Sequence, residues 1–238
     1  MELTILGKYG PYGKKGSGAA SGYLVSHEDE NLLLDFGSGV LTRLIDKIKI
    51  EKLSAIFISH LHFDHTSDLL PFRYLLDELK IPVTTYTHKE ISPWYDVLFT
   101  HPLIKTVDID GMSVIDSGKM TLTFFKTDHP VTNHGIRVST PDGTLVYTGD
   151  TRFYKNLPDD VMGADLVLAD CAKPDGFIGG HMTAKDAVML QKISGARIIA
   201  THIAPGFDPE NLFSNEDNIE IAEEGKTYKV TKNGKTDI

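Results

Sequence analysis

Three histidines and an aspartate stand within six residues, directly behind an apolar strand pattern at residues 55–59: His60, His62, Asp64 and His65. Residues two apart on an extended backbone point the same way, so His60 and His62 can hold one ion. Asp64 and His65 lie where the chain should turn toward a helix, and they can hold a second ion. Imidazole and carboxylate suit Zn²⁺, and also Mn²⁺ or Fe²⁺. The run therefore predicts a metal centre at the end of a strand rather than a histidine-rich surface turn.

Further candidate ligands follow later apolar strand patterns along the chain. They are His129 after residues 122–127, Asp150 at the end of 145–149, and His202 at the end of 198–201. A carboxylate can lie between two cations and partly offset their repulsion, which makes Asp150 the natural bridge. Each residue alone would be an ordinary loop residue, but together with the first cluster they complete two metal sites.

The distribution of strands and helices indicates an α+β fold in a single domain covering residues 1–238. Strands are predicted at residues 3–6, 23–26, 32–36, 53–58, 81–86, 106–109, 112–115, 122–127, 135–139, 145–147, 166–168 and 197–200. Helices are predicted around 40–48 and 69–79, and after Thr183, whose hydroxyl can cap a helix with Asp186 at the capping-box position. Residues 88–104 stay ambiguous, and residues 230–238 form a polar tail. Two sets of strands, each followed by helices, predict two sheets packed face to face with helices outside.

The bulk composition excludes several classes of protein. The formal charge of −9 argues against stable nucleic-acid binding, because proteins that grip phosphate backbones carry a basic face. No apolar run approaches the roughly 20 residues of a membrane span, and residues 1–7 lack the basic start of a secretory signal. The single cysteine, Cys171, forms no intrachain disulfide, in agreement with a cytoplasmic location.

The run from His60 to His65 matches the His-x-His-x-Asp-His signature of the metallo-β-lactamase superfamily. The later order of His129, Thr-Gly-Asp-Thr at 148–151 and Thr-His at 201–202 resembles its phosphodiesterase branch, which includes ribonuclease Z and cyclic-phosphate phosphodiesterases. The segments Ile-Leu-Gly at residues 5–7 and Leu-Asp-Phe-Gly-Ser-Gly at residues 34–39 are also similar to this branch. The resemblance covers the chain from residue 3 to about residue 205.

The resemblance implies an αββα sandwich of two mixed sheets flanked by helices, with two divalent ions at one edge of the sheets. Zn²⁺ is the metal expected there. It implies one ion on His60, His62 and His129, and a second on Asp64, His65 and His202. It also implies Asp150 as the bridge and a hydroxide between the ions.

The resemblance also suggests two catalytic residues. Asp64 has a second carboxylate oxygen that can orient the nucleophile. His181, just before a helix, is similar to a proton-relay histidine of ribonuclease Z and is expected to protonate the leaving oxygen. Asp170 falls near that enzyme's glutamate partner, with a shorter reach. A structural role for His181 stays open.

The expected activity is hydrolysis of a small or cyclic phosphodiester. Ribonuclease Z carries a tRNA-clamping arm between its equivalents of His129 and Asp150, but only twenty residues separate the two here, so tRNA 3′-processing is disfavoured. A lactonase shares the metal pattern and stays an alternative. A metallo-β-lactamase proper tends to lack the bridging carboxylate that Asp150 offers here. A flavin-linked di-iron enzyme would have Glu at position 62, where this chain has His. A scaffold without activity should have lost ligands. Relatives are often dimers, so a homodimer is a further expectation.

Some residues have no assigned role at this point. The Gly-rich segment 7–22 does not fit a phosphate-binding loop and is either a mobile loop near the site or a set of plain turns. His134 is expected in a loop near His129. Cys171 is expected to be a buried small residue. Surface or packing roles are expected for three further histidines, His27, His88 and His101.

Overall fold

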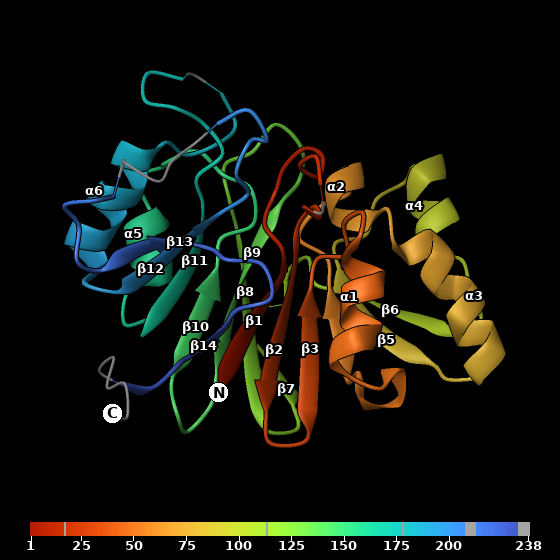
Figure 1. The fold of residues 1–238 in the computed structure, drawn as a ribbon. Coiled ribbons are helices and arrows are strands. Elements are labelled where there is room, and N and C mark those ends of the chain that lie inside the picture. The colour runs from red at the N-terminus through yellow and green to blue at the C-terminus, as the bar shows by residue number, and fades with distance from the viewer. Residues whose placement is uncertain (17, 113, 178, 208–212, 233–238) are drawn as a thin grey trace.

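Two seven-stranded sheets lie face to face, with helices on both outer faces, in a computed structural model that describes residues 1–16, 18–112, 114–177, 179–207 and 213–232. Figure 1 shows α1, α3 and α4 on one outer side and α5 and α6 on the other. The predicted αββα sandwich of two mixed sheets is confirmed. No helix in the described part of the chain has the length and apolar character to cross a membrane.

The first sheet is built from the N-terminal half and one late strand. In spatial order it holds β14 (Thr227–Lys229), β1 (Glu2–Gly7), β2 (Gly22–His27), β3 (Glu30–Leu34), β4 (Ala55–Phe57), β5 (Val83–Thr87) and β6 (Ile104–Asp108). The strands from β3 to β6 are parallel. The connections between them contain α1 (Val40–Lys47), α2 (Phe63–Thr66), α3 (Leu69–Leu79) and α4 (Pro93–Phe99). Because these strands run the same way, their carboxyl ends meet at one edge.

The second sheet has the same layout. Its spatial order is β13 (Ile219–Ile221), β12 (Arg197–Thr201), β11 (Leu166–Asp170), β10 (Thr144–Tyr147), β9 (His134–Ser139), β8 (Met120–Lys126) and β7 (Val114–Ser117). The strands from β10 to β13 are parallel, with α5 (Leu157–Val161) and α6 (Ala184–Ser194) in two of the connections. The carboxyl ends of these strands again meet at one edge.

Apolar side chains fill three layers, one between the sheets and one under each set of helices. The period of two along a strand explains this: Leu34 faces the other sheet, whereas Leu33 faces the helices. Across the middle layer, the rings of Phe57 and Phe124 stack with centroids 5.8 Å apart. The two sheets therefore pack against each other close to the ends of β4 and β8, and candidate ligands follow both of these strands.

Most predicted elements are present, and the differences have local causes. Thr183 caps α6 in a full capping box with Asp186, as predicted. The ambiguous interval 88–104 contains α4 and the start of β6. The short β13 and β14 were not predicted, because a strand of three residues offers too little alternation to detect. Of the predicted polar tail at 230–238, residues 233–238 lie outside the described chain.

Candidate metal centre

The candidate ligands gather at the edge where the parallel strands end, near α2 in Figure 1. His60 and His62 follow β4 on extended backbone, and His62 is the residue that precedes the first turn of α2. Asp64 and His65 lie inside that turn, as predicted. The change from strand to helix places the two pairs on different sides of one short segment.

The structure brings all seven predicted ligands into two neighbouring groups, and a third group of the same kind joins Asp150 and His202 to Asp170 and His181. Within each group the potential ligand atoms lie within 4.8 Å of one another: His60, His62, His129 and Asp150 in the first, and Asp64, His65 and His202 in the second. Asp150 Oδ2 lies 3.7 Å from His60 Nε2, 3.4 Å from His65 Nε2 and 3.3 Å from His202 Nε2. Asp150 therefore lies between the two groups.

The donor set fits divalent cations. His60 Nε2 and His62 Nδ1 face each other at 2.8 Å, and His129 Nε2 lies 3.4 Å from the same His62 atom. Three ring nitrogens converging in this way suit a shared cation. Two buried atoms at the centre, His65 Nε2 and Asp150 Oδ1, have no hydrogen-bond partner among the described residues. Both atoms are therefore available to coordinate an ion at this centre.

The first group is electrostatically prepared for metal binding. Burial lowers the pKa of His60 well below its ordinary value, and the nearby His65 lowers it further. Burial likewise lowers the pKa values of His62 and His129. These three imidazoles are therefore neutral near pH 7, which is the state that binds a metal ion.

In the second group, and at Asp150 between the groups, the acids and histidines hold one another as ion pairs. Burial alone would raise the pKa of Asp150, but His202 and His65 hold it well below its usual range. Asp64 follows the same pattern, with burial opposed by His65 and His202. Burial lowers the pKa of His202, yet Asp150 and Asp64 raise it to about 9. A bound cation would replace the proton that His202 carries between these carboxylates.

The residue that sequence reasoning missed is Asp35, which is fully buried behind His65. Its Oδ2 accepts hydrogen bonds from His65 Nδ1 at 2.7 Å and from the Tyr147 hydroxyl at 2.6 Å. Its carboxylate also accepts from the Ser59 amide at 2.7 Å and the Ser59 hydroxyl at 2.8 Å. Asp35 thereby fixes the His65 ring with Nε2 toward the centre. An aspartate ending a buried apolar strand was the available signal, the same one that indicated Asp150.

His181 and Asp170 form the pair that the sequence left open. Asp170 Oδ2 accepts a hydrogen bond from His181 Nδ1 at 2.9 Å, so the shorter side chain reaches. Asp170 is fully buried at the end of β11, and its other oxygen accepts from the Ala172 amide at 3.0 Å. His181 Nδ1 lies 3.9 Å from Asp150 Oδ2, and the His181 ring stacks on His202 with centroids 5.1 Å apart. His181 therefore adjoins the metal centre.

The Gly-rich segment lies against the centre. The Ile203 amide donates to the Lys8 carbonyl at 2.8 Å, and the Gly10 amide donates to the Ile203 carbonyl at 3.2 Å. A Cβ placed on Gly10 would lie 2.0 Å from His202 Nε2. Gly10 is therefore required by the close approach of the backbone to a candidate ligand. Of the two interpretations, the structure supports the location near the site.

The other histidines and the cysteine lie outside the two groups. His134 was expected in a loop, but it is the buried first residue of β9, because that strand begins one residue earlier than predicted. Its ring stacks on the buried His88 with centroids 5.7 Å apart. Cys171 is buried, as expected.

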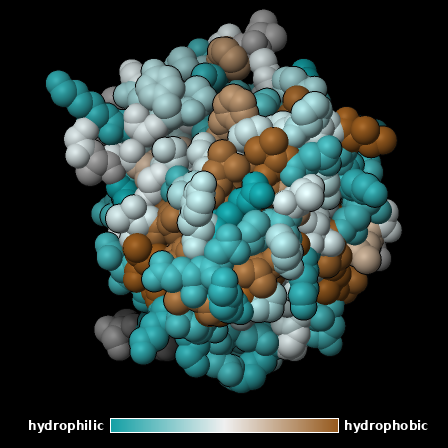
Figure 2. All heavy atoms as spheres, turned by 90° about the vertical axis from the view of Figure 1, so that its right-hand side faces the viewer, coloured by the Kyte–Doolittle hydropathy of each residue, from teal (hydrophilic) through white to brown (hydrophobic). Residues whose placement is uncertain are grey.

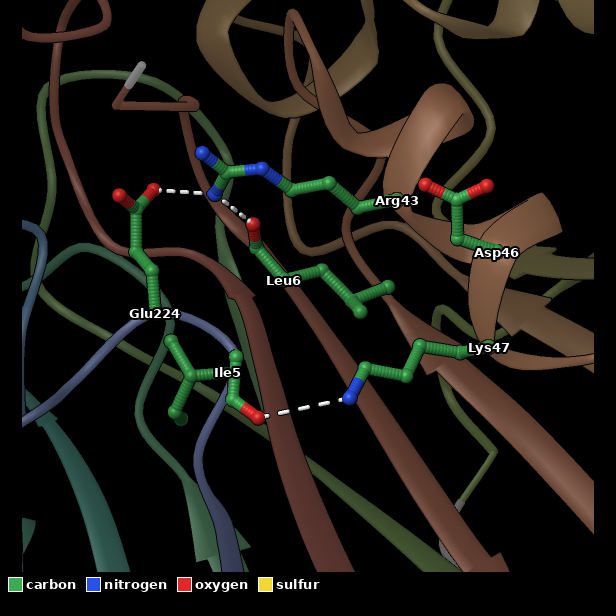
Figure 3. A pocket seen from close by; sticks show the side chains of 7 residues that line it. Ile5, Leu6, Arg43, Asp46, Lys47 and Glu224 are labelled. Carbon is green, nitrogen blue, oxygen red and sulfur yellow. Dashed lines mark hydrogen bonds and ion pairs between the residues drawn. The ribbon is translucent and has the colours of Figure 1, made fainter. Parts of the chain in front are cut away.

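A separate cavity of ≈370 Å³ lies between α1, β1 and the segment before β14. Figure 3 shows Arg43 reaching from α1 to the Leu6 carbonyl and the Glu224 carboxylate. Lys47 Nζ donates to the Gly225 carbonyl at 3.4 Å. These contacts bind the helix, the strand and the late segment together. None of its lining residues belongs to the two ligand groups, so this cavity is distinct from the metal centre.

Comparison with protein families and with known proteins identifies the family of this chain. Residues 31–203 match the beta-lactamase superfamily domain. The chain belongs to the metallo-β-lactamase superfamily. The probable metallo-hydrolase YhfI of Bacillus subtilis is 31% identical over 237 residues, which cover 92% of this chain and 96% of that protein. The crystal structure of YhfI covers 95% of this chain and 98% of its own with a TM-score of 0.89 and 29% identity. Superfamily and relative together identify this chain as a metallo-hydrolase.

More distant members of the superfamily share the architecture. Ribonuclease Z of Saccharolobus solfataricus is 24% identical, with 78% of this chain and 83% of that protein covered. A diphosphatase from the PhnP family is 17% identical and has a TM-score of 0.77, with 97% of this chain and 99% of that chain covered. At that identity the likeness shows the fold alone.

Proposed function

We propose that this metallo-hydrolase is a dinuclear phosphodiesterase that cleaves a small or cyclic phosphodiester. The observation that carries the proposal is the position of Asp150 between two complete ligand groups, with its Oδ2 atom within 3.7 Å of His60, His65 and His202 nitrogens. One carboxylate shared in this way suits two adjacent cations, Zn²⁺ first, with Mn²⁺ or Fe²⁺ as alternatives.

The ligands would divide as the resemblance implies. His60, His62 and His129 would hold one ion, Asp64, His65 and His202 the other, and Asp150 both. When bound, such ions supply a water that ionises near neutral pH and positive charge for phosphoryl oxygens. The partition is supported by two of the three groups of ligand atoms that lie within 4.8 Å of one another, the third being Asp150, Asp170, His181 and His202.

Two side chains are proposed to act on the reacting atoms. Asp64 carries a carboxylate whose Oδ2 pairs with His202 Nε2 at 3.1 Å, and its other oxygen would accept a hydrogen bond from the attacking water and orient it. His181 would protonate the leaving oxygen from Nε2, because Asp170 holds the Nδ1 proton.

The size of the substrate follows from the segment between His129 and Asp150. All residues from 130 to 149 are described, and they form only β9, β10 and their connecting turns. This segment has no projecting arm comparable to a tRNA clamp. Together with the charge of −9, this favours a small phosphodiester over tRNA 3′-processing.

The metal centre alone would also serve a lactonase or another ester hydrolase, which makes this class the second candidate. The His181–Asp170 pair would serve either class, because an alkoxide leaving from phosphorus and one leaving from an acyl carbon both need a proton donor near pH 7, so the choice of substrate has to be measured.

A panel of substrates on zinc-loaded protein tests the proposal: bis-p-nitrophenyl phosphate, a 2′,3′-cyclic nucleotide, a γ-lactone and a chromogenic β-lactam. We expect hydrolysis of the phosphodiesters, two ions per chain by elemental analysis, and loss of both in Asp150→Ala. The matched control is Asp142→Ala, an exposed aspartate outside the centre that should keep metal and activity. Preferential turnover of the lactone, or full activity in Asp150→Ala, would contradict the proposal.

A further inference from the structure

An aromatic side chain stands exposed inside the metal-binding run. Phe63 lies between His62 and Asp64, and 65% of its surface is accessible. Its ring meets that of Trp94 edge to face, with centroids 4.8 Å apart and planes inclined by 76°. Because 65% of Phe63 stays accessible in this contact, ring surface of Phe63 remains open to another aromatic group.

The pair is held firmly at the metal centre. Trp94 Nε1 donates a hydrogen bond to the Leu61 carbonyl at 3.1 Å, within the same run. Trp94 is in the first turn of α4, where the Ser92 hydroxyl accepts from the Tyr95 amide at 3.2 Å. A capped helix on one side and the metal-binding run on the other therefore fix the position of the pair.

The surface around the pair is partly apolar. Ile91, which leads into α4, is fully exposed. Figure 2 views the molecule from the side of α3 and α4 and shows brown, hydrophobic patches set among hydrophilic side chains. A contiguous exposed apolar patch marks a binding surface, whereas apolar residues scattered singly do not. No part of the proposed hydrolysis uses this surface.

We propose that Phe63 and Trp94 form a stacking surface for a planar aromatic group of the substrate, so that the substrate class is a nucleobase-bearing phosphodiester. This inference rests on the proposed function. With the phosphoryl group at the metal centre, the base lies on the adjacent aromatic pair. Stacking on an aromatic ring tolerates every base, because each base has a π-face, so the surface selects for a base and not for a particular one.

The first test measures binding and needs no turnover. Trp94 is the only tryptophan, so intrinsic tryptophan fluorescence reports on this pair alone. On zinc-loaded protein, we expect adenosine monophosphate to change the emission saturably and to bind about tenfold more tightly than ribose 5-phosphate, which competes without the base. In Phe63→Leu the preference for the nucleotide should be lost, whereas Tyr74→Leu, which removes a 79% exposed aromatic on α3, should keep it. Equal affinity for both phosphates in the wild type would overturn the inference.

The second test compares a 2′,3′-cyclic nucleotide with the cyclic phosphate of ribose that lacks a base. Phe63→Leu should raise KM about tenfold more for the nucleotide than for the base-free substrate, while Phe63→Trp restores the wild-type ratio of the two KM values. Equal losses on both substrates would overturn the stacking role. Base-selective binding without hydrolysis of either substrate would support the stacking surface and refute the phosphodiesterase.

Discussion

His65 Nδ1 donates a 2.7 Å hydrogen bond to Asp35 Oδ2, and both side chains are fully buried. The bond turns the other ring nitrogen of His65 toward Asp150, at 3.4 Å. The same Asp35 carboxylate binds the Ser59 amide and the Tyr147 hydroxyl, so one residue links the end of β3 to β10 and to the metal-binding run. A carboxylate behind a ligating histidine sets its tautomer and raises its basicity.

Asp35→Asn tests this support. Asp35 has a φ of 57°, a conformation that Asn tolerates, so the backbone should be retained. An amide accepts fewer hydrogen bonds and carries no charge, so we expect metal affinity to fall by about 10–100-fold. Competition with a chromogenic chelator measures the affinity, and Asp142→Asn is the matched control. Unchanged affinity in Asp35→Asn would show that His65 needs no such partner.

Gly10→Ala tests the packing of the Gly-rich segment on His202. The new Cβ would lie 2.0 Å from His202 Nε2, so the ring or the segment must move. A ligand displaced by about 1 Å can lower activity by about 100-fold, and we expect a loss of that order in kcat/KM on bis-p-nitrophenyl phosphate. The control is Gly206→Ala, where the added methyl meets nothing within 4 Å. Equal activities of the two variants would contradict the prediction.

His181→Asn should separate leaving groups. If His181 protonates the leaving oxygen, kcat should fall by about 10²–10⁴-fold for an alkyl phosphodiester, whose leaving group needs a proton. Release of p-nitrophenolate needs none, so bis-p-nitrophenyl phosphate should be nearly unaffected. Asp170→Asn should give a smaller loss in the same direction, because it acts through His181. A uniform loss on both substrates would assign His181 to metal binding, as its place beside Asp150 also allows.

The buried pair His88–His134 should make the protein acid-sensitive. Burial and the neighbouring His88 lower the pKa of His134 to about 4, with Asp110 opposing, against 6.5 for an unperturbed histidine. The unfolded chain therefore binds a proton at a higher pH than the folded protein. This part of the stability is complete above pH 6.5, is lost as the pH falls toward about 4, and amounts to about 3 kcal/mol.

His134→Phe keeps a ring beside His88 and removes the titration. Urea unfolding of metal-free protein at pH 7 and pH 4.5 should show a smaller acid loss in the variant than in the wild type. His101→Gln is the control, because His101 lies outside the His88–His134 pair, contacting Asp77 across 3.4 Å and accepting from the Leu103 amide at 3.3 Å, and this variant should lose stability like the wild type. An identical loss in all three proteins would exclude His134 as the sensor.

The sequence determined the ligand types, the order of the strands that carry them and the architecture. These features rest on short-range regularities: alternation along β3 and β4, the capping box of Thr183, and acids or histidines placed directly behind apolar strands. The absence of a tRNA-clamping arm between His129 and Asp150 could also be predicted, because it follows from the number of residues between them.

Only the tertiary structure decided how distant residues meet. Asp35 and His65 are thirty positions apart, Gly10 and His202 are nearly the whole chain apart, and no local pattern registers either approach. The contact of Phe63 with Trp94 depends on where α4 packs, in an interval whose sequence was ambiguous. Strand and helix periods report which face a side chain takes, whereas its partner is set by sheet order and helix packing. The candidate ligand set was therefore predicted from short motifs, whereas the contacts of Asp35, Gly10 and the Phe63–Trp94 pair emerged only from the packing of β3, α4 and the Gly-rich segment.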